Sequence, residues 1–196
     1  NAMLQKVGGD LYVGIMTVIN SVREVISMPV SGVTNSAQPV LGFNYGAKEY
    51  KRVRQGIVFT SICSVVYTTL IWLCVHEFPE FFIRIFNRNG DLLAEGVPAM
   101  RIYFFGFFMM SLQFAGQAVF VGLGKSRYAV FFSIFRKVII VIPLILILPT
   151  VFHLGTDGIL MAEPVSNFIG GAACFGTMLF TVWPELKGKK KAVNDK

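Results

Sequence analysis

The sequence PVSGVTNSAQPVLGFNYGAKEYKRV, residues 29–53, joins a long apolar segment to a short basic loop. Before it, residues 11–22 are mostly apolar and meet the adjacent charges Arg23 and Glu24. The stretch itself holds two prolines and three glycines, and four basic residues follow one another closely at its end: Lys48, Lys51, Arg52 and Arg54. This pattern is not typical of a helix in a soluble protein. It predicts a membrane helix that bends, exposes backbone groups and lines a wet cavity.

The composition indicates lipid as the main solvent of the chain. Of its 196 residues, 54% are hydrophobic and only 15% are charged, whereas soluble domains carry about 25% charged residues. The net charge of +7 comes from basic residues at the ends of apolar runs, which is typical of membrane loops and excludes nucleic acid as a partner. Three cysteines lie inside apolar runs without metal-ligand spacing, so we interpret them as small hydrophobic residues: Cys63, Cys74 and Cys174.

A membrane span needs about 20 apolar residues, and the chain contains five such segments. The fold class is therefore an all-α integral membrane protein with five transmembrane helices. The first helix is expected to continue toward Gly46, and the expected spans are residues 11–34, 57–75, 102–124, 128–152 and 158–183.

The loops give the expected direction of the spans. Basic loops stay in the cytoplasm, and the basic loops are residues 48–54, 124–127 and the tail 185–196. The C-terminus is therefore expected in the cytoplasm and the N-terminus outside, in a bacterial inner membrane. We interpret residues 1–3 as the remnant of an expression tag and residues 4–184 as part of a longer transporter.

Three segments carry a family resemblance. The run GVTNSAQPVLGFNYGAKEYKRV at 32–53 resembles the signature of the multidrug and toxic compound extrusion (MATE) transporters. The segments at 120–149 and 153–167, FVGLGKSRYAVFFSIFRKVIIVIPLILILP and HLGTDGILMAEPVSN, agree with that family in order and spacing. The similarity is greatest to the bacterial branch of damage-inducible and staphylococcal multidrug pumps.

The resemblance implies a fold and a function. Members of this family have twelve helices in two lobes, and the chain resembles helices 8–12, the C-terminal lobe without its first helix. It implies export of amphipathic compounds and organic cations, coupled to Na⁺ or H⁺ entry, with a missing N-terminal lobe as partner and no cofactor. The chain alone is expected to be inactive. Two alternatives stay open: a lipid-linked sugar flippase or polysaccharide exporter of the same superfamily, and a membrane partner subunit that does not transport.

Charged residues inside a span are costly and mark candidate ion or substrate pathways. Arg23 and Glu24 are adjacent and need partners on other helices, and Glu24–Arg136 is a plausible pair; Arg136 could instead extend to the interface, as is expected of its neighbour Lys137. Glu163 is either a first-turn carboxylate favoured by the helix dipole or a protonatable group at the mouth of a cavity. The family motif often has an acid at the position of Asn167, so the resemblance makes a cation role there doubtful.

Amide side chains complete the candidate pathway. Gln113 and Gln117 share one helix face, where contacts between helices are favoured over contact with substrate. Gln38 and Asn44 belong to the family signature and are expected to hold the bend of the first helix open. No activated nucleophile or metal set accompanies them, so an enzyme is not expected.

Overall fold

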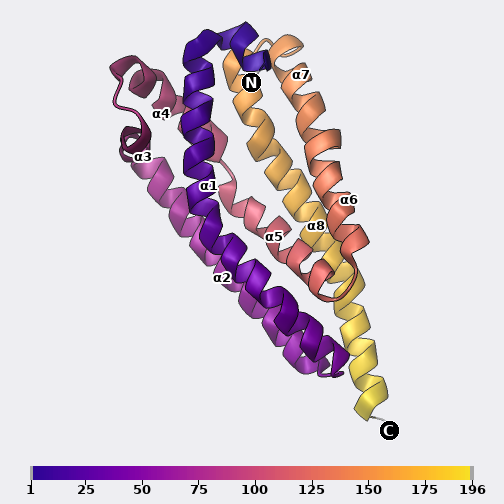
Figure 1. The fold of residues 1–196 in the computed structure, drawn as a ribbon. Coiled ribbons are helices and arrows are strands. Elements are labelled where there is room, and N and C mark those ends of the chain that lie inside the picture. The colour runs from indigo at the N-terminus through magenta and orange to yellow at the C-terminus, as the bar shows by residue number, and fades with distance from the viewer. Residues whose placement is uncertain (1, 195–196) are drawn as a thin grey trace.

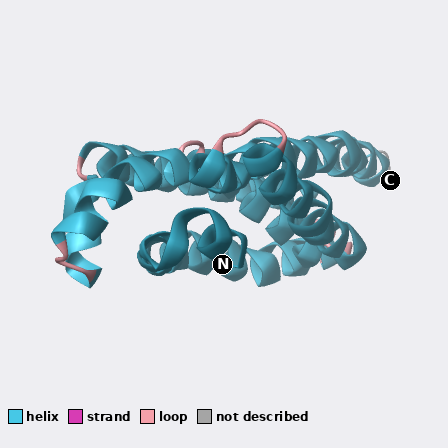
Figure 2. Ribbon diagram, turned by 90° about the horizontal axis from the view of Figure 1, so that it is seen from above, coloured by secondary structure: helices cyan, strands magenta, loops and turns pink. Residues whose placement is uncertain are grey.

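The computed structural model describes residues 2–194, and within them it contains helices joined by short connections and no strand (Figures 1 and 2). The predicted all-helical fold is therefore confirmed. In chain order the helices are α1 Ala2–Gly46, α2 Tyr50–Glu77, α3 Pro79–Phe86, α4 Gly90–Phe104, α5 Phe107–Gly122, α6 Ser126–Ile134, the π-helix η1 Phe135–Val141, α7 Ile142–Thr150 and α8 Gly155–Asn194.

Four described helices are long and apolar enough to cross a membrane, and the bent pair α4–α5 brings the number to five. The expected spans 57–75 and 158–183 lie inside α2 and α8, and the span 128–152 corresponds to α6, η1 and α7 together. The number and order of the predicted spans are thus confirmed.

The first helix differs from the prediction in where it is interrupted. It continues to Gly46 as expected, but helical dihedral angles persist through Pro29 and Pro39, and the non-helical point lies at Gly9, with φ 68°. The helix is therefore not broken at its prolines. Prolines are tolerated in membrane helices more often than in soluble ones. After each proline, a polar side chain of the same helix donates a hydrogen bond one turn back: Thr34 to the carbonyl of Val30, and Asn44 to that of Val40.

The third expected span, residues 102–124, is not one straight helix. It is broken between α4 and α5, whose axes differ by 43°. Gly106 has φ 81°, a left-handed conformation that glycine adopts without steric cost. A Cβ added there would also lie 2.4 Å from the ring of Phe168 in α8. Both constraints explain why the break falls at this residue.

Helix α5 is the centre of the bundle and packs against α1, α2 and α8. Small residues allow the closest approach: a Cβ added to Gly171 in α8 would lie 2.4 Å from the backbone oxygen of Met109 in α5. Gly116 of α5 is equally close-fitting, because its added Cβ would lie 3.0 Å from the sulfur of Cys174. Small residues thus let the backbones of α5 and α8 approach each other closely at these positions.

The outer surface of the bundle is apolar, as lipid requires. Exposed apolar side chains follow one another at helical spacing along α2, where they form a continuous ridge: Val58, Ile62, Val66 and Leu70. Exposed apolar residues also cover α6, η1 and α7. These helices bury only a minor share of their side chains inside the protein, which agrees with spans that face a bilayer.

The bundle has two ends, which differ in the connections that lie there (Figure 1). We call the end with α3, the first residues of α1 and the α7–α8 connection the α3 end. The opposite end, with the α1–α2 and α5–α6 connections, is called the basic end, because Lys48, Lys51, Arg52 and Lys125 lie there. Helices α1 and α8 both run from the α3 end to the basic end.

Candidate functional site: a charged network and a polar cavity inside the spans

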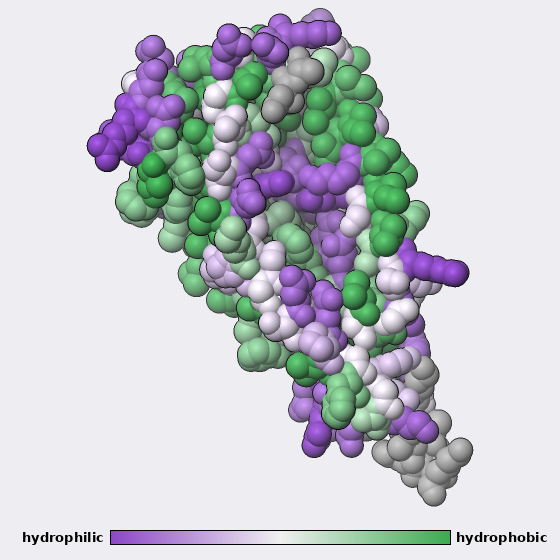
Figure 3. Space-filling view, in the orientation of Figure 1, coloured by the Kyte–Doolittle hydropathy of each residue, from purple (hydrophilic) through white to green (hydrophobic). Residues whose placement is uncertain are grey.

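Hydrophilic residues gather in the middle of one face of the bundle, between α1 and the α6–η1–α7 segment (Figure 3). Apolar residues border this region on both sides (Figure 3). Helices α5 and α8 form its floor, since α5 packs against α1, α6 and α8, and α8 packs against η1 and α7. A polar region between two apolar borders is the arrangement expected of an aqueous pathway inside a membrane protein.

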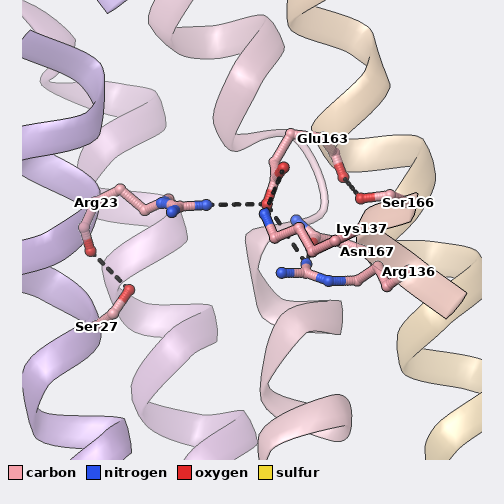
Figure 4. A network of polar contacts seen from close by, with 7 residues as sticks. All are labelled: Arg23, Ser27, Arg136, Lys137, Glu163, Ser166 and Asn167. Carbon is pink, nitrogen blue, oxygen red and sulfur yellow. Dashed lines mark hydrogen bonds and ion pairs between the residues drawn. The ribbon is translucent and has the colours of Figure 1, made fainter. Parts of the chain in front are cut away.

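Glu163 of α8 is the centre of this region (Figure 4). Arg23 reaches it from α1, with 3.0 Å between Nη1 and Oε1. From η1, Arg136 Nη1 lies 3.4 Å from the same oxygen, and Lys137 Nζ lies 3.6 Å from Oε2. The Glu163 side chain is only 9% exposed. One carboxylate thus joins three cationic side chains from two other segments of the chain.

Asn167 completes the network from the next turn of α8. Its amide oxygen accepts a hydrogen bond from Arg136, which is itself almost fully buried. The aliphatic part of Arg136 fits against Gly170, where an added Cβ would lie 2.9 Å from the Arg136 Cδ. Arg136 also lies in the π-helix η1, and π-helical segments are frequent at functional sites. Glu163, Asn167 and Gly170 therefore form one face of α8 that holds Arg136.

Three sequence-based interpretations of these charges are corrected. The expected Glu24–Arg136 pair is wrong, because Arg136 pairs with Glu163 and Glu24 is exposed on α1. Arg23, and not Glu24, is the residue of α1 that enters the network, through its contact with Glu163. Glu163 is not a first-turn carboxylate, because α8 begins more than two turns earlier, at Gly155. Lys137 does not simply extend to the interface: it approaches Glu163, although half of its side chain stays exposed.

A cavity of about 180 Å³ lies beside the network, between α5 and η1. It is lined by Met110, Gln113, Phe114, Gln117, Ser133, Arg136 and Lys137. Gln117 donates a hydrogen bond of 2.8 Å to the hydroxyl of Ser133 in α6, which confirms the predicted contact between helices. Two buried atoms at this cavity have no hydrogen-bond partner, Gln113 Oε1 and Arg136 Nε.

Helix α1 carries a polar stripe that the sequence analysis missed. Six polar residues repeat every three or four positions, and all are exposed or partly exposed: Asn20, Glu24, Ser27, Ser31, Asn35 and Gln38. Such spacing places side chains on one helix face. The repeat itself is present in the sequence as polar residues at helical spacing.

The polar stripe ends at a second cavity, of about 380 Å³, which Asn35 and Gln38 line together with Gln117 and Ser133. Gln38 donates to Asn35 at 3.2 Å, and Asn44 donates to the carbonyl of Val40 at 2.8 Å. Both of these bonds are local to α1. The two cavities share Gln117 and Ser133, so the polar region extends from the charged network toward the basic end.

A second group of charges links the helices at the basic end. Lys125, in the α5–α6 connection, pairs with Glu185 of α8, and Tyr45 of α1 donates a hydrogen bond of 2.7 Å to the same carboxylate. Arg54 of α2 lies 4.6 Å above the ring of Trp183 in α8, a cation–π contact. Within the described residues, no group of three or more His, Cys, Asp or Glu side chains is placed to hold a metal ion.

These features define the class of protein: a multi-pass helical membrane protein with a polar pathway inside its spans. The family follows from the comparison with family models, in which the MatE model matches residues 1–147. The chain belongs to the MatE family, whose members are transporters and not enzymes. A comparison with curated proteins found no match.

Solved structures show the same fold. One is a multidrug resistance MATE family transporter of the MOP superfamily, to which the chain is similar in the inward-facing form (TM-score 0.84, 14% identity) and in the outward-facing form (TM-score 0.86, 15% identity). Another is a MATE protein in its bent conformation, with a TM-score of 0.88 and 16% identity. A third is a MOP superfamily transporter from Pyrococcus furiosus, with a TM-score of 0.86 and 14% identity.

These alignments include 96–98% of this chain but only 41–43% of each solved chain. The chain thus spans about two-fifths of the length of these transporters and has the fold of one half of a MATE transporter.

Proposed function

We propose that the chain is the C-terminal lobe of a secondary-active multidrug exporter, which moves amphipathic compounds, organic cations among them, by alternating access. The observation that carries this proposal is the similar agreement of one rigid fold with an inward-facing and an outward-facing transporter. A lobe that keeps its shape in both states suits a mechanism in which lobes rock against each other around a central site.

The partner in this mechanism is an N-terminal lobe. The charged network and the polar stripe of α1 each line a cavity, and the two cavities share Gln117 and Ser133. Charged or polar groups at membrane depth favour a wet cavity or a protein partner over lipid. In this proposal residues 4–184 form the lobe and residues 185–196 the basic tail. The tail and the basic end lie in the cytoplasm of a bacterium, because cytoplasmic loops are rich in lysine and arginine. The damage-inducible and staphylococcal branch remains our proposed placement.

The coupling ion, Na⁺ or H⁺, is proposed to act in the other lobe. Both carboxylate oxygens of Glu163 already lie near cationic side chains. Asn167, one turn further along α8, offers an amide oxygen that Arg136 occupies. A cation that entered here would meet three positive side chains at short range, and the Coulomb repulsion would disfavour its binding.

The test is efflux of ethidium, an amphipathic cation, from bacterial cells that produce the protein encoded by the whole gene carrying this sequence. Efflux that an uncoupler abolishes, and that depends on a Na⁺ or H⁺ gradient, is the expected result. Cells with the empty vector are the background, and an Arg84→Gln variant is the matched control, because Arg84 pairs only on the exposed surface of α3. Ethidium efflux that persists without any ion gradient would contradict secondary-active transport.

A second function, export of a lipid-linked sugar, is favoured by one observation: the cationic side chains of the network outnumber its carboxylate. Lipid-linked sugars carry phosphate groups, which arginine and lysine bind. For the Pyrococcus furiosus transporter of the same fold, a reverse polarity of the binding pocket suggests a different function. Normal ethidium retention combined with loss of surface polysaccharide in a deletion strain would decide for this alternative.

A further inference from the structure

The charged network is not electrically balanced. Arg23, Arg136 and Lys137 surround Glu163 as the one carboxylate in contact with them among the described residues. When all four are ionised the network carries two excess positive charges. Glu24 is the other nearby carboxylate on α1, and including it still leaves an excess of one. Uncompensated charge within a membrane span is costly, so the excess calls for an anion.

The cavity beside the network offers unused polar atoms. Arg136 is 8% exposed, and its Nε has no hydrogen-bond partner. Gln113, 5% exposed, has an amide oxygen without a partner. Buried polar groups are normally paired, and those that are not need an explanation such as an absent ligand. Both side chains line the 180 Å³ cavity, where a ligand could satisfy them.

Lys137 is the most adaptable member of the site. Its Nζ lies 3.6 Å from Glu163, which is the longest contact in the network, and half of its side chain is exposed. A small movement would direct this ammonium group into the cavity that it lines. Met110 and Phe114 of α5 supply an apolar wall of the same cavity. The site therefore combines a half-exposed ammonium group, a buried guanidinium group and an apolar surface.

We propose that this cavity binds the anionic group of an amphipathic molecule, a sulfonate, carboxylate or phosphate, between Lys137 and Arg136. The apolar part of the molecule lies against Met110 and Phe114, and Gln113 Oε1 accepts a hydrogen bond from a hydroxyl or amide next to the anion. Glu163 is the counter-ion of the empty site, and the bound anion competes with it for Lys137. The transport role of the site rests on the function proposed above, but binding itself does not.

The experiment measures binding to the purified chain in nanodiscs of phosphatidylcholine, which carries no net charge. Three probes share one apolar ring and differ in charge: benzenesulfonate, benzyl alcohol and benzylammonium. Isothermal titration calorimetry is expected to show benzenesulfonate binding at least about tenfold more tightly than the other two, the difference that one charge-assisted hydrogen bond produces. Equal affinities, tighter benzylammonium binding, or no binding of benzenesulfonate would overturn the proposal.

Two variants separate binding from folding. Lys137→Gln removes the partly exposed cation and is expected to weaken benzenesulfonate binding about tenfold. Glu163→Gln keeps the shape of the side chain but removes the competing charge, and is expected to strengthen binding about tenfold. A merely structural role of Glu163 predicts weaker binding instead. Only protein that elutes as one symmetric peak is titrated, and Arg84→Gln, which removes a charge at the surface of α3, is the control and should change the affinity less than about twofold.

The anion could come from a solute or from a lipid headgroup. Repeating the titration in nanodiscs with phosphatidylglycerol distinguishes them, since a headgroup in the site would compete with benzenesulfonate and a solute site would be unaffected. Either result supports an anion site. An unchanged affinity in Lys137→Gln would overturn it. Tight benzenesulfonate binding without ethidium efflux would refute the proposed function alone, and efflux without benzenesulfonate binding would refute this inference alone.

Discussion

Two charged groups join α1 to α8, and they differ in depth and in exposure to solvent. At the network, Arg23 contacts Glu163, and at the basic end, Tyr45 contacts Glu185; both contacts join residues 140 positions apart. The two helices therefore run parallel and in register, with the contacts about 33 Å apart along each helix at 1.5 Å per residue.

The two carboxylates differ in exposure. Glu185, which pairs with Lys125, is about a quarter exposed, as is that lysine, so water screens the pair and its contribution to stability is modest. Glu163 is 9% exposed and is close to three cations. Similar side chains therefore have different roles in the two groups. The contacts at the basic end join the termini of the helices, while the network keeps uncompensated charge where a ligand can reach it.

The largest expected effect on stability comes from replacing the two carboxylates, Glu163 and Glu185, one at a time. Glu163→Ala leaves three cations without their counter-ion and is expected to cost about 3–5 kcal/mol of stability, as removal of one partner of a buried ion pair does. Glu185→Ala is expected to cost about 1 kcal/mol, because its partners are screened. Thermal unfolding in detergent, followed by the monodisperse fraction after heating, checks both. Equal losses would mean that the two groups are energetically alike.

The next effect concerns the α5–α8 contact that supports the network. Gly171→Ala forces a methyl group against the backbone of Met109 and is expected to destabilise the protein by about 1–3 kcal/mol. Gly176→Ala is the matched control in the same helix, because an added Cβ there meets nothing within 4 Å. It should be neutral or stabilising by up to about 1 kcal/mol. The same heating assay compares them, and similar behaviour of both variants would refute the close approach.

The smallest effect distinguishes amides that join helices from amides that do not. Gln117→Leu removes bonds from α5 to Ser133 and to the carbonyl of Ala129, which is expected to cost about 0.6–1.7 kcal/mol. Gln38→Leu removes only a bond within α1, to Asn35, and should leave stability unchanged. Unfolding of the two variants in a graded series of denaturing detergent gives the difference. A larger loss for Gln38→Leu would show that α1 uses that side chain to contact another helix.

Most of the fold could be predicted from the sequence, because a helix that crosses lipid needs about 20 consecutive, mostly apolar residues. Apolar runs of span length fixed the number and order of the helices, and the extension of the first helix to Gly46 was expected. The errors fell where local signals compete. Prolines point to an interruption of α1, but helical dihedral angles persist at both of them, and the interruptions lie at Gly9 and Gly106, where φ is positive.

The candidate site was predictable in its residues but not in its pairing. Charges inside spans mark Arg23, Arg136 and Glu163 as candidates, whereas Asn167 is a candidate only through the family resemblance. Their partners depend on which helices are neighbours and on helix rotation, and the sequence does not contain this information in readable form. Glu24 was chosen for Arg136, although one residue of rotation gives that position to Arg23. Lys137 was set aside because long side chains commonly extend to the interface.

Water access to α1 tests the central claim most directly, namely that its polar stripe lines a wet pathway while the ridge of α2 faces lipid. In a variant with Cys63, Cys74 and Cys174 replaced by alanine, single cysteines at Glu24→Cys and Asn35→Cys are compared with Ile62→Cys and Val66→Cys. A membrane-impermeant maleimide is added to nanodiscs, since only a hydrated thiolate reacts. The account predicts labelling of the α1 positions at least about tenfold faster than of the α2 positions. Equal rates, or faster labelling on α2, would contradict it.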